Sequence, residues 1–516
     1  MLKIKKMISQ ALENKRILIF QQRNWAVHTG HFLATKLQAE GCKLVAFTLK
    51  KSTHEFIINQ QEVKYELIIS NDEVMNNPKA YLRGEKYDLG EICRALGIDS
   101  IWPLVSVLRH HVKSYKDKYY YSFRQNVSDE GIIDYVMATY KVVKNIFDQF
   151  NPQIILAPNF VSFPHIVFNL YAQKRGVTMI AVTDCKVTGP LIFTYSYNDD
   201  AGPFYDRIDE LNGKRAETAN RDKAKEYIKN FRKNFIKPDT YQFTKNRSAK
   251  QSLSKMIKNE LRPYYQIFQW YTTKKLNVLE STGITPDYRP PKIILRDHYG
   301  HKRYEKFMNN YNYYPFEKLG KYVYLPLNFQ PEANIDVVAP YFANQIETAR
   351  QIAMSLPDDY TLAVKEHPEM LGFRSPSYLE KLARTPNVKL IDYRISSEQV
   401  LKGADMVVSP NSTTLVEAAF YNKPALQLGN LGTTLKLPNV AKYTEMTSVA
   451  RKIKELLASD FHNDDYEWRL ENFVAAAFDT GFYAHFEKLW EKKETEELEI
   501  LWQVYKKEIE QVLAKS

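Results

Sequence analysis

The stretch "DMVVSPNSTTLVEAAFYNKPALQLG", residues 405–429, holds a complete strand–loop–helix–strand unit. An apolar strand ends at Pro410, a helix is expected over residues 413–421, and a second apolar strand starts at Pro424. Parallel strands need a crossover of this kind, which is usually a helix. The stretch therefore predicts a parallel α/β sheet.

The same alternation of strands and helices extends along the chain on both sides of this stretch. In the second half we expect strands at residues 321–327, 360–366, 388–392, 405–410 and 424–429. In the first half we expect them at residues 16–20, 43–49, 152–158 and 177–184. The pattern predicts an α/β protein with two Rossmann-like, doubly wound domains that face a cleft.

Changes in composition suggest where these domains begin and end. We expect a first domain over residues 1–290, with a Lys- and Tyr-rich helical insertion at about residues 205–271. The Pro-rich segment 283–291 is the expected linker, because proline prevents regular structure. The second domain is expected over residues 291–455, and C-terminal helices over 456–516 are expected to pack back across both domains.

The overall composition narrows the class of protein. The chain has 516 residues, 44% hydrophobic and 26% charged, with no apolar run near the ~20 residues that a membrane-spanning helix needs. Its three cysteines lie far apart, which argues against a zinc site and suits a reducing cytoplasm. The N-terminus lacks the features of a signal peptide, so we expect a cytoplasmic protein.

The net charge of +12 suggests an anionic partner. Basic residues alternate with acidic ones, and no RNA-binding signature is present, so we expect no nucleic-acid partner. Peripheral contact with the inner membrane leaflet is compatible with the charge.

Polar clusters follow four of the expected strands of the second half. They are "PLNFQPEAN" at 326–334, "KEHPE" at 365–369, "SPNSTT" at 409–414 and "GNLGTT" at 429–434. In a doubly wound sheet the carboxyl ends of the strands meet at one edge, where ligands bind. The four clusters therefore predict one ligand site.

The cluster after the strand at 405–410 has the composition of a phosphate site. Free amide hydrogens at a helix start, together with hydroxyl groups, bind phosphate well, and a carboxylate one turn later could accept hydrogen bonds from a ribose. The predicted residues are Asn411, Ser412, Thr413, Thr414 and Glu417. The alternative is that the hydroxyl groups only cap the helix.

The cluster "KEHPE" offers further donors at the same edge. Lys365 and His367 can both donate to a phosphate oxygen, and Pro368 holds the chain at the turn. His367 would stabilise the charge on a departing phosphate, unless it is simply paired with Glu366 or Glu369. In "PLNFQPEAN", Gln330 and Glu332 are candidates for binding sugar hydroxyls, or equally for a capped turn.

These motifs, in this order, carry a family resemblance. "PLNFQPEA", "VKEHPEMLGFRS", "VKLID" and "ADMVVSPNSTTLVEAAFYNKPALQLG" resemble the bacterial capsular-polysaccharide biosynthesis proteins, which include 3-deoxy-octulosonic acid (Kdo) transferases. The His-Pro pair and the Ser/Thr cluster are similar to the nucleotide site of bacterial sialyltransferases with the two-domain GT-B fold. The resemblance covers about residues 321–429 and implies that His367, Pro368, Ser412 and Thr413 lie at the donor phosphate.

The resemblance implies a glycosyltransferase of surface-polysaccharide assembly with a GT-B-like fold. It would transfer a sugar from a nucleotide-sugar donor, with a CMP-linked acidic sugar such as Kdo or sialic acid expected, to a glycan or glycolipid hydroxyl. Those sialyltransferases take their general base from an acidic-acidic-Gly motif, whereas "NDDAG" at 198–202 has one extra residue. Asp200, Asp184 and His31 are therefore all candidate bases.

Several other functions remain open at this stage. The pairs His28/His31 and His298/His301 lack a third ligand nearby, so we expect no obligatory metal or other cofactor. A UDP-sugar transferase or UDP-sugar 2-epimerase would use the same fold, and metal dependence would distinguish a diphosphate donor. A non-catalytic assembly subunit is the alternative from another class.

Overall fold

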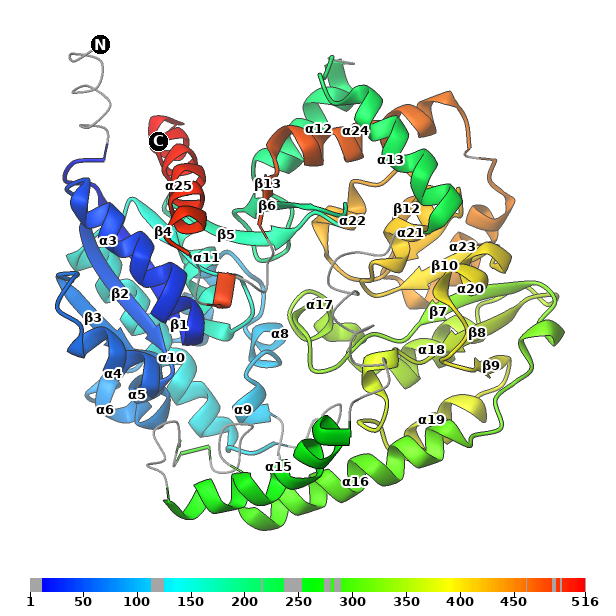
Figure 1. Cartoon of the computed structure of the whole chain (residues 1–516), viewed down its shortest axis with the longest axis horizontal. Coiled ribbons are helices and arrows are strands. Elements are labelled where there is room, and N and C mark those ends of the chain that lie inside the picture. The colour runs from blue at the N-terminus through cyan, green and yellow to red at the C-terminus, as the bar shows by residue number, and fades with distance from the viewer. Residues whose placement is uncertain are drawn as a thin grey trace.

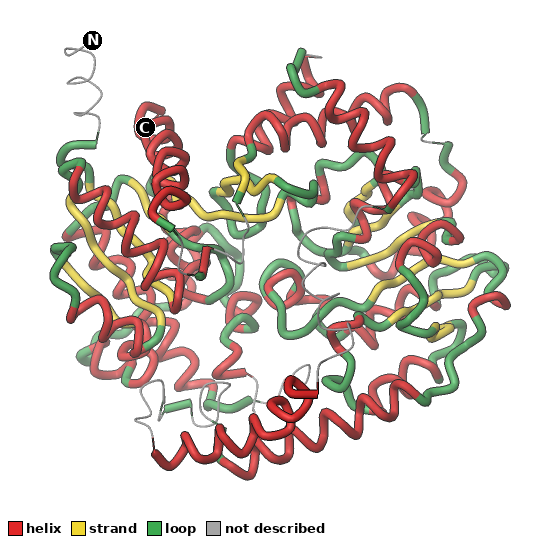
Figure 2. The backbone as a smooth tube through the Cα atoms, in the orientation of Figure 1, coloured by secondary structure: helices red, strands yellow, loops and turns green. Residues whose placement is uncertain are grey.

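The computed structural model contains two β-sheets in separate halves of the molecule (Figures 1 and 2). It describes residues 12–112, 125–214, 217–235, 253–272, 279, 281–282, 289–460, 462–484, 489–491 and 494–515. The predicted fold class is confirmed: both halves are Rossmann-like, with helices packed on parallel strands. Residues 236–252 of the expected insertion and 283–288 of the expected linker lie outside the described residues.

The first sheet has the strand order β13-β6-β5-β4-β1-β2-β3. Its strands are β1 (Arg16–Gln22), β2 (Lys43–Leu49), β3 (Leu67–Ser70), β4 (Ile154–Leu156), β5 (Thr178–Asp184), β6 (Pro190–Thr194) and β13 (Phe482–Tyr483). Strands β1 to β5 pair in parallel, with Phe20 of β1 opposite Phe47 of β2. Strands β6 and β13 extend the sheet in antiparallel fashion.

The second sheet has the order β12-β11-β10-β7-β8-β9, with every pair parallel. Its strands are β7 (Tyr322–Pro326), β8 (Thr361–Lys365), β9 (Val388–Ile391), β10 (Met406–Ser409), β11 (Ala425–Gln427) and β12 (Val440–Lys442). The chain runs outward through β8 and β9 on one side of β7 and through β10 to β12 on the other. The strand order therefore reverses between β7 and β10, and a doubly wound sheet binds its ligand at that point.

Helices cover both sheets. In the first half they are α2 (Arg23–Trp25), the π-helix η1 (Ala26–Gly30), α3 (His31–Ala39), α4 (Lys51–Asn59), α5 (Asn71–Asn76), α6 (Pro78–Leu82), α7 (Leu89–Leu96), α8 (Trp102–Val105), α9 (Arg109–Val112), α10 (Asp129–Gln149) and α11 (Phe163–Lys174). In the second half they are α17 (Ala333–Asp336), α18 (Gln345–Ala353), α19 (Pro376–Ala383), α20 (Ser397–Gly403), α21 (Thr414–Phe420), α22 (Gly432–Leu435) and α23 (Val449–Ala458), with 3₁₀ turns η2 (Phe316–Lys318), η3 (Pro340–Phe342), η4 (Pro368–Met370) and η5 (Met446–Ser448).

Among its described residues, the middle of the chain supplies four further helices. They are α12 (Pro203–Lys214), α13 (Arg221–Asn234), α15 (Leu253–Thr272) and α16 (Pro291–Asn309). Helix α13 packs on α21 and on α24 (Asp464–Thr480). Between α13 and α21 the tilted rings of Phe231 and Phe420 have centroids 4.4 Å apart. Helices α15 and α16 lie side by side along the lower edge of Figure 1.

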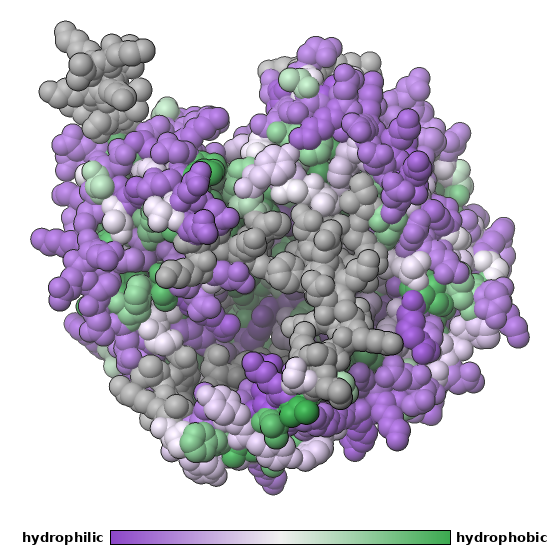
Figure 3. Space-filling view, viewed as in Figure 1, coloured by the Kyte–Doolittle hydropathy of each residue, from purple (hydrophilic) through white to green (hydrophobic). Residues whose placement is uncertain are grey.

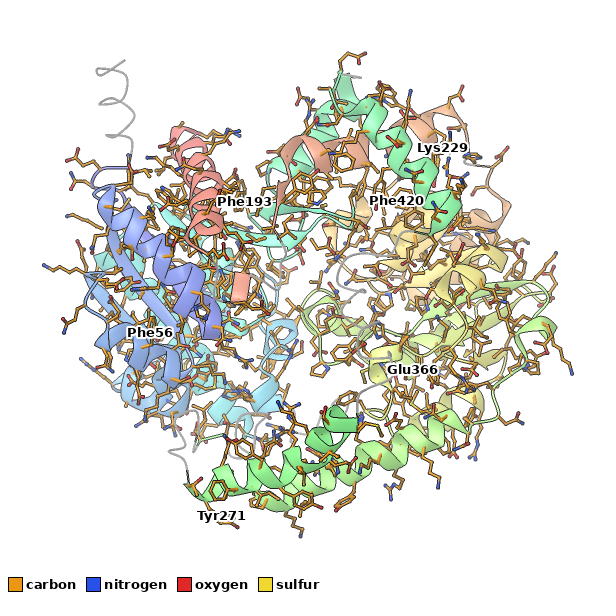
Figure 4. The ribbon with its side chains drawn as sticks, viewed as in Figure 1. Phe56, Phe193, Lys229, Tyr271, Glu366 and Phe420 are labelled. Carbon is orange, nitrogen blue, oxygen red and sulfur yellow. The ribbon has the colours of Figure 1, made fainter. Side chains whose placement is uncertain are left out.

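The C-terminal segment returns to the first half. After α24, strand β13 pairs with β6, and α25 (Thr495–Lys515) packs on the first sheet. Trp502, Tyr505 and Ile509 of α25 join the core with Ile17 and Phe193, and the rings of Tyr505 and Phe193 meet edge to face. Figure 4 shows Phe193 beside this helix. The final helix therefore completes the core of the first half.

Candidate functional site

The loops after β7 and β10 meet at the point where the order of the second sheet reverses. Asn328, two residues after β7, is buried and donates from Nδ2 to the main-chain oxygen of Asn411. The Asn411 side chain accepts hydrogen bonds at Oδ1 from Gln427 Nε2 (3.0 Å) and the Leu431 amide (3.2 Å). It also donates to the main-chain oxygen of Asn334 (2.8 Å). The sequence-predicted Asn411 therefore holds three loops together from inside the protein.

A buried ion pair fixes the loop after β8. Glu366 and Arg374 both have side chains with 0% exposure, and Arg374 Nη1 lies 2.7 Å and 2.9 Å from the two Glu366 carboxylate oxygens. Arg374 Nη2 also donates to the Asn328 main-chain oxygen at 2.6 Å, which joins this loop to the loop after β7. Burial raises the pKa of Glu366, and the charge of Arg374 opposes that rise. Figure 4 marks Glu366 in the second half.

His367 comes directly after Glu366 in the chain, and its ring is a neutral hydrogen-bond donor. Its Nδ1 accepts the Glu369 amide hydrogen at 3.2 Å, so the ring proton of the neutral form lies on Nε2. Burial, together with the positive charges of Arg374 and Lys365, lowers the pKa of His367 to about 4. The ring lies edge-on to Phe329, with the centroids 6.0 Å apart, and Pro368 begins the turn η4. The alternative, in which the His367 ring is paired with the carboxylate of Glu366 or Glu369, is not what the structure shows, because the ring accepts a main-chain hydrogen bond instead.

The hydroxyl cluster lies at the start of α21. Ser412 Oγ accepts the Thr414 amide hydrogen at 3.1 Å and donates to Thr414 Oγ1 at 3.2 Å. Ser412 and Thr413 are half-buried, and the Thr413 side chain makes no capping bond. Glu417 is buried one turn into the helix. Ser412 thus shapes the turn, and the Thr413 hydroxyl takes no part in it.

Two predicted residues have other partners. Lys365 Nζ donates to the Ile395 main-chain oxygen and to Ser397 Oγ, both at 3.0 Å, and so ties β8 to the start of α20. The Gln330 amide is buried, where it donates to the Ala343 main-chain oxygen and accepts from Gln345. Both side chains hold loops, so neither enters the site that we propose.

A group of charged residues from the first half approaches the same edge. Lys186 Nζ lies 3.2 Å from Asp184 Oδ2 at the end of β5. Burial alone lowers the pKa of Lys186, but the charges of Asp184, Asp199 and Glu332 outweigh that effect and raise it. Glu332 belongs to the loop after β7, and burial raises its pKa against the charges of Lys186 and Arg109. Lys186 and Glu332 therefore interact between the two halves.

Among the acidic residues of this group, Asp199 has a pKa well above its usual value. Its Oδ2 accepts a hydrogen bond from Thr183 Oγ1 at 3.0 Å, and burial raises its pKa to about 6. The residue has a left-handed backbone, with φ of 52°. At neutral pH this carboxylate is ionised and close to the pKa that suits a general base.

The turn that carries Asp199 contacts the second half. The Gly432 amide of α22 donates to the Asn198 main-chain oxygen at 2.8 Å, and Tyr205 Oη lies 3.1 Å from Thr433 Oγ1. Arg109 of α9 and Asp336 of α17 form a second link, with Nε and Oδ2 3.3 Å apart. Figure 3 shows the surface hollowed between the two halves on this face. Asp199 thus lies where the halves meet.

The other candidate bases are placed differently. Asp184 is held by the Lys186 amide and ammonium, and Asp200 is exposed next to Asp199. His31 Nε2 lies 2.9 Å from Glu62 Oε2 within the first half, and its ring meets Phe56 edge to face. The structure therefore brings Asp184 and Asp200 into the group around Asp199, and it pairs His31 with a residue outside that group.

Sequence reasoning did not assign roles to Asn328, Arg374, Lys186 and Arg109. Asn328 and Arg374 lie inside motifs that carried the family resemblance, but nothing in their spacing indicated a buried link between them. Among the described residues, no group of three or more His, Cys, Asp and Glu side chains is arranged to hold a metal ion. No described helix is long and apolar enough to cross a membrane.

No family model and no curated protein sequence matches the chain. Among solved structures, the chain is similar to the KpsC β-Kdo 2,7-transferase of Thermosulfurimonas dismutans, with 12% identity, 71% of this chain and 89% of that one covered, and a TM-score of 0.34. A putative UDP-N-acetylglucosamine 2-epimerase from Listeria monocytogenes gives 11% identity, coverage of 90% and 94%, and a TM-score of 0.23. The calicheamicin glycosyltransferase CalG4 gives 12% identity, with 90% of this chain and 95% of that one covered and a TM-score of 0.26. Similarity at this level leaves function to be argued from the site.

Proposed function

We propose that the protein is a glycosyltransferase that moves a sugar from a nucleotide-sugar donor to a hydroxyl of a glycan or glycolipid. The observation that carries the proposal is the meeting of two sets of groups. The loops after β7, β8 and β10, joined through Asn328, present the His367 N–H and the hydroxyl groups at α21. The turn of Asp199, from the other sheet, contacts α22 beside them.

In the proposed reaction these two sets have separate roles. Asp199 takes the proton of the acceptor hydroxyl, whose oxygen forms the new bond to the anomeric carbon. The bond from that carbon to the donor phosphate breaks, and the phosphate leaves with the electron pair. The Nε2–H of His367 and the hydroxyl group of Thr413, which takes no part in the turn, donate to its oxygens and stabilise the developing charge, while Ser412 holds the turn.

Asp199 is the preferred base on physical grounds. A carboxylate with a pKa of about 6 is a stronger base than an ordinary one and is still ionised at neutral pH. Asp184 is instead paired with Lys186, and Asp200 is exposed to solvent. The Asp199→Asn variant is expected to lower turnover by about 10²–10⁴-fold.

The donor class that we propose is a CMP-linked acidic sugar, supported by the resemblance of the His-Pro and Ser/Thr motifs. The proposal includes surface-polysaccharide assembly, a cytoplasmic location, and no obligatory metal. A glycolipid acceptor would bring the enzyme to a membrane surface as a peripheral protein.

Nucleotide binding tests the proposal directly. We would titrate the full chain calorimetrically with CMP, CDP, UMP, UDP and GDP, with and without EDTA. Tight CMP binding that EDTA leaves unchanged is the expected result. A preference for UDP would move the assignment to a UDP-sugar transferase or 2-epimerase, and no binding to any nucleotide would favour a non-catalytic assembly subunit.

Substitution of His367 locates the binding site. His367→Ala is expected to weaken CMP binding by about ten-fold or more, ~1.4 kcal/mol. His367→Gln retains an N–H donor and guards against a folding defect. The matched control is His462→Ala. His462 is exposed, it pairs with the nearby Glu467, and it lies far from His367 in the chain. Equal affinity of wild type and His367→Ala would refute the assigned site.

A further inference from the structure

Helix α15 exposes an apolar stripe to solvent. Ile257, Leu261, Tyr264, Phe268 and Tyr271 follow one another at intervals of four and three residues, so they share one side of the helix. Ile257 is 59% exposed, Leu261 58% and Phe268 62%. Met256 and Tyr265, also exposed, flank the stripe. A helix of a globular protein normally turns such a side inward, so this stripe marks a contact surface.

The helix is held in this orientation by α16. Glu260 of α15 pairs with Lys302 and lies 3.6 Å from His298 Nε2. The hydroxyl groups of Tyr264 and Tyr299 lie 2.8 Å apart, and Pro263 is buried. Figure 3 shows hydrophobic atoms at the lower edge of the molecule, where α15 runs in Figure 1, and Figure 4 marks Tyr271 at the end of this helix. The stripe is therefore presented outward by a helix pair.

The charges next to the stripe are mostly positive. The exposed basic residues of the two helices are Lys258, Arg262, Lys292, Lys302, Arg303 and Lys306. Among the described side chains of α15 and α16, Glu260 is the one exposed acidic residue. Apolar and aromatic side chains beside a basic rim are typical of helices that lie in the interface of an anionic bilayer.

We propose that the pair α15–α16 docks on an anionic membrane surface, with the stripe of α15 at the boundary between head groups and acyl chains. Tyrosine suits that depth, because its ring is apolar and its hydroxyl stays in contact with water. A second copy of the chain fits less well, because a two-fold contact through this stripe would bring the two basic rims together. The inference does not rest on the proposed sugar transfer.

Co-sedimentation of the full chain with vesicles tests this surface. Phosphatidylcholine vesicles with and without phosphatidylglycerol are compared at low and high salt. We expect binding to the phosphatidylglycerol vesicles that weakens with salt. The double variant Ile257→Ser/Phe268→Ser is expected to weaken it by about ten-fold or more. The control is Met354→Ser/Ile500→Ser, since these residues are 69% and 61% exposed but lie elsewhere.

Three results would overturn the inference. The first is failure to bind either kind of vesicle, and the second is equal binding by both double variants. The third is self-association, seen by light scattering, that Ile257→Ser/Phe268→Ser abolishes. That result would mean that a second copy of the chain covers the stripe. Nucleotide titration of the same variant separates this surface from the proposed active site. CMP affinity that is unchanged while vesicle binding is lost supports two independent sites.

Discussion

At the scale of single residues, Asp199 makes stability depend on pH in an unusual direction. Its pKa rises from 3.8 to about 6 because the carboxyl is buried. Between those values the folded state binds more protons than the unfolded state, so the stabilisation is complete below about pH 4 and is lost as pH rises through about 6. The ionised carboxylate costs on the order of 2–3 kcal/mol above that range.

Asp199→Asn should therefore make the protein more stable at about pH 7 and leave it unchanged at about pH 4. The amide oxygen can still accept the Thr183 hydroxyl, so the hydrogen bond survives. Melting temperatures of both proteins across this pH range provide the measurement. Asp200→Asn is the control, because Asp200 is exposed beside it. Lower stability of Asp199→Asn at neutral pH would contradict the assigned environment.

The ion pair Glu366–Arg374 gives a second residue-scale prediction. Arg374→Met should lower the free energy of unfolding by about 3–5 kcal/mol, because it leaves a carboxylate buried without its partner charge. The double variant Glu366→Gln/Arg374→Met should recover most of that loss. Denaturant unfolding followed by circular dichroism measures both variants.

The control for the ion pair is Arg350→Met. Arg350 pairs with Glu347 at the surface, where both side chains are more than two-fifths exposed. An exposed pair contributes about 0–1 kcal/mol, so this variant should resemble wild type. The double variant of Glu366 and Arg374 could prove as unstable as the single one. In that case the packing of Arg374, rather than its charge, would account for the lost free energy of unfolding.

At the scale of elements, α25 contributes to the core of the first half through Tyr505. The ring is fully buried, and its hydroxyl has no hydrogen-bond partner within the described part of the chain. Tyr505→Phe is expected to be neutral or slightly stabilising. Tyr505→Ala leaves a cavity and should cost about 3–5 kcal/mol. Thermal unfolding of both variants checks this.

The exposed Ile500 on the same helix supplies the matched control, since Ile500→Ala should change stability by less than about 0.5 kcal/mol. A large loss with Tyr505→Phe would mean that the hydroxyl is hydrogen-bonded after all. Equal stability of Tyr505→Ala and wild type would mean that α25 does not complete the core.

Local sequence patterns predicted the strands that have long apolar runs, and they could not predict those formed by distant pairing. The run "KLVAFTL" forms β2 over the expected residues, and the expected helix at 413–421 is α21. Strand β13 has two residues and pairs with β6 about 290 positions earlier, so no nearby pattern identifies it. Element type follows from local periodicity, whereas this pairing depends on how the whole chain closes.

The candidate site shows the same division. The rule that ligands bind at strand ends predicted that the loops with His367 and Ser412 lie at one edge, and Asn328 links those loops. Spacing cannot say which way a side chain points, so the bonds of Lys365 to Ile395 and Ser397 were not predictable. The contribution of Asp199 was missed for the same reason, because its pKa depends on burial by distant segments.

At the scale of the whole molecule, Gly432 sets how closely the two halves approach. A Cβ atom at this position would lie 2.3 Å from the Asp199 main-chain oxygen and 2.6 Å from Asp200 Cα. These are backbone atoms of the other half, so they cannot rotate out of the way. Gly432→Ala should therefore push the turn of Asp199 away from α22 and weaken the contact between the halves.

We expect Gly432→Ala to have a larger radius of gyration in small-angle X-ray scattering, a lower melting temperature, and reduced turnover with retained nucleotide affinity. Retained affinity is expected because the donor groups belong to the second half, whereas Asp199 comes from the first. The control is Gly213→Ala in α12, where no atom lies within 4 Å of the added Cβ. That variant should be unchanged or more stable by about 0.5–1 kcal/mol. An unchanged scattering profile would contradict the predicted displacement of the turn. If Gly432→Ala changed the scattering profile but kept full turnover, catalysis would not require the Asp199 turn to contact α22, and the base would have to be sought elsewhere.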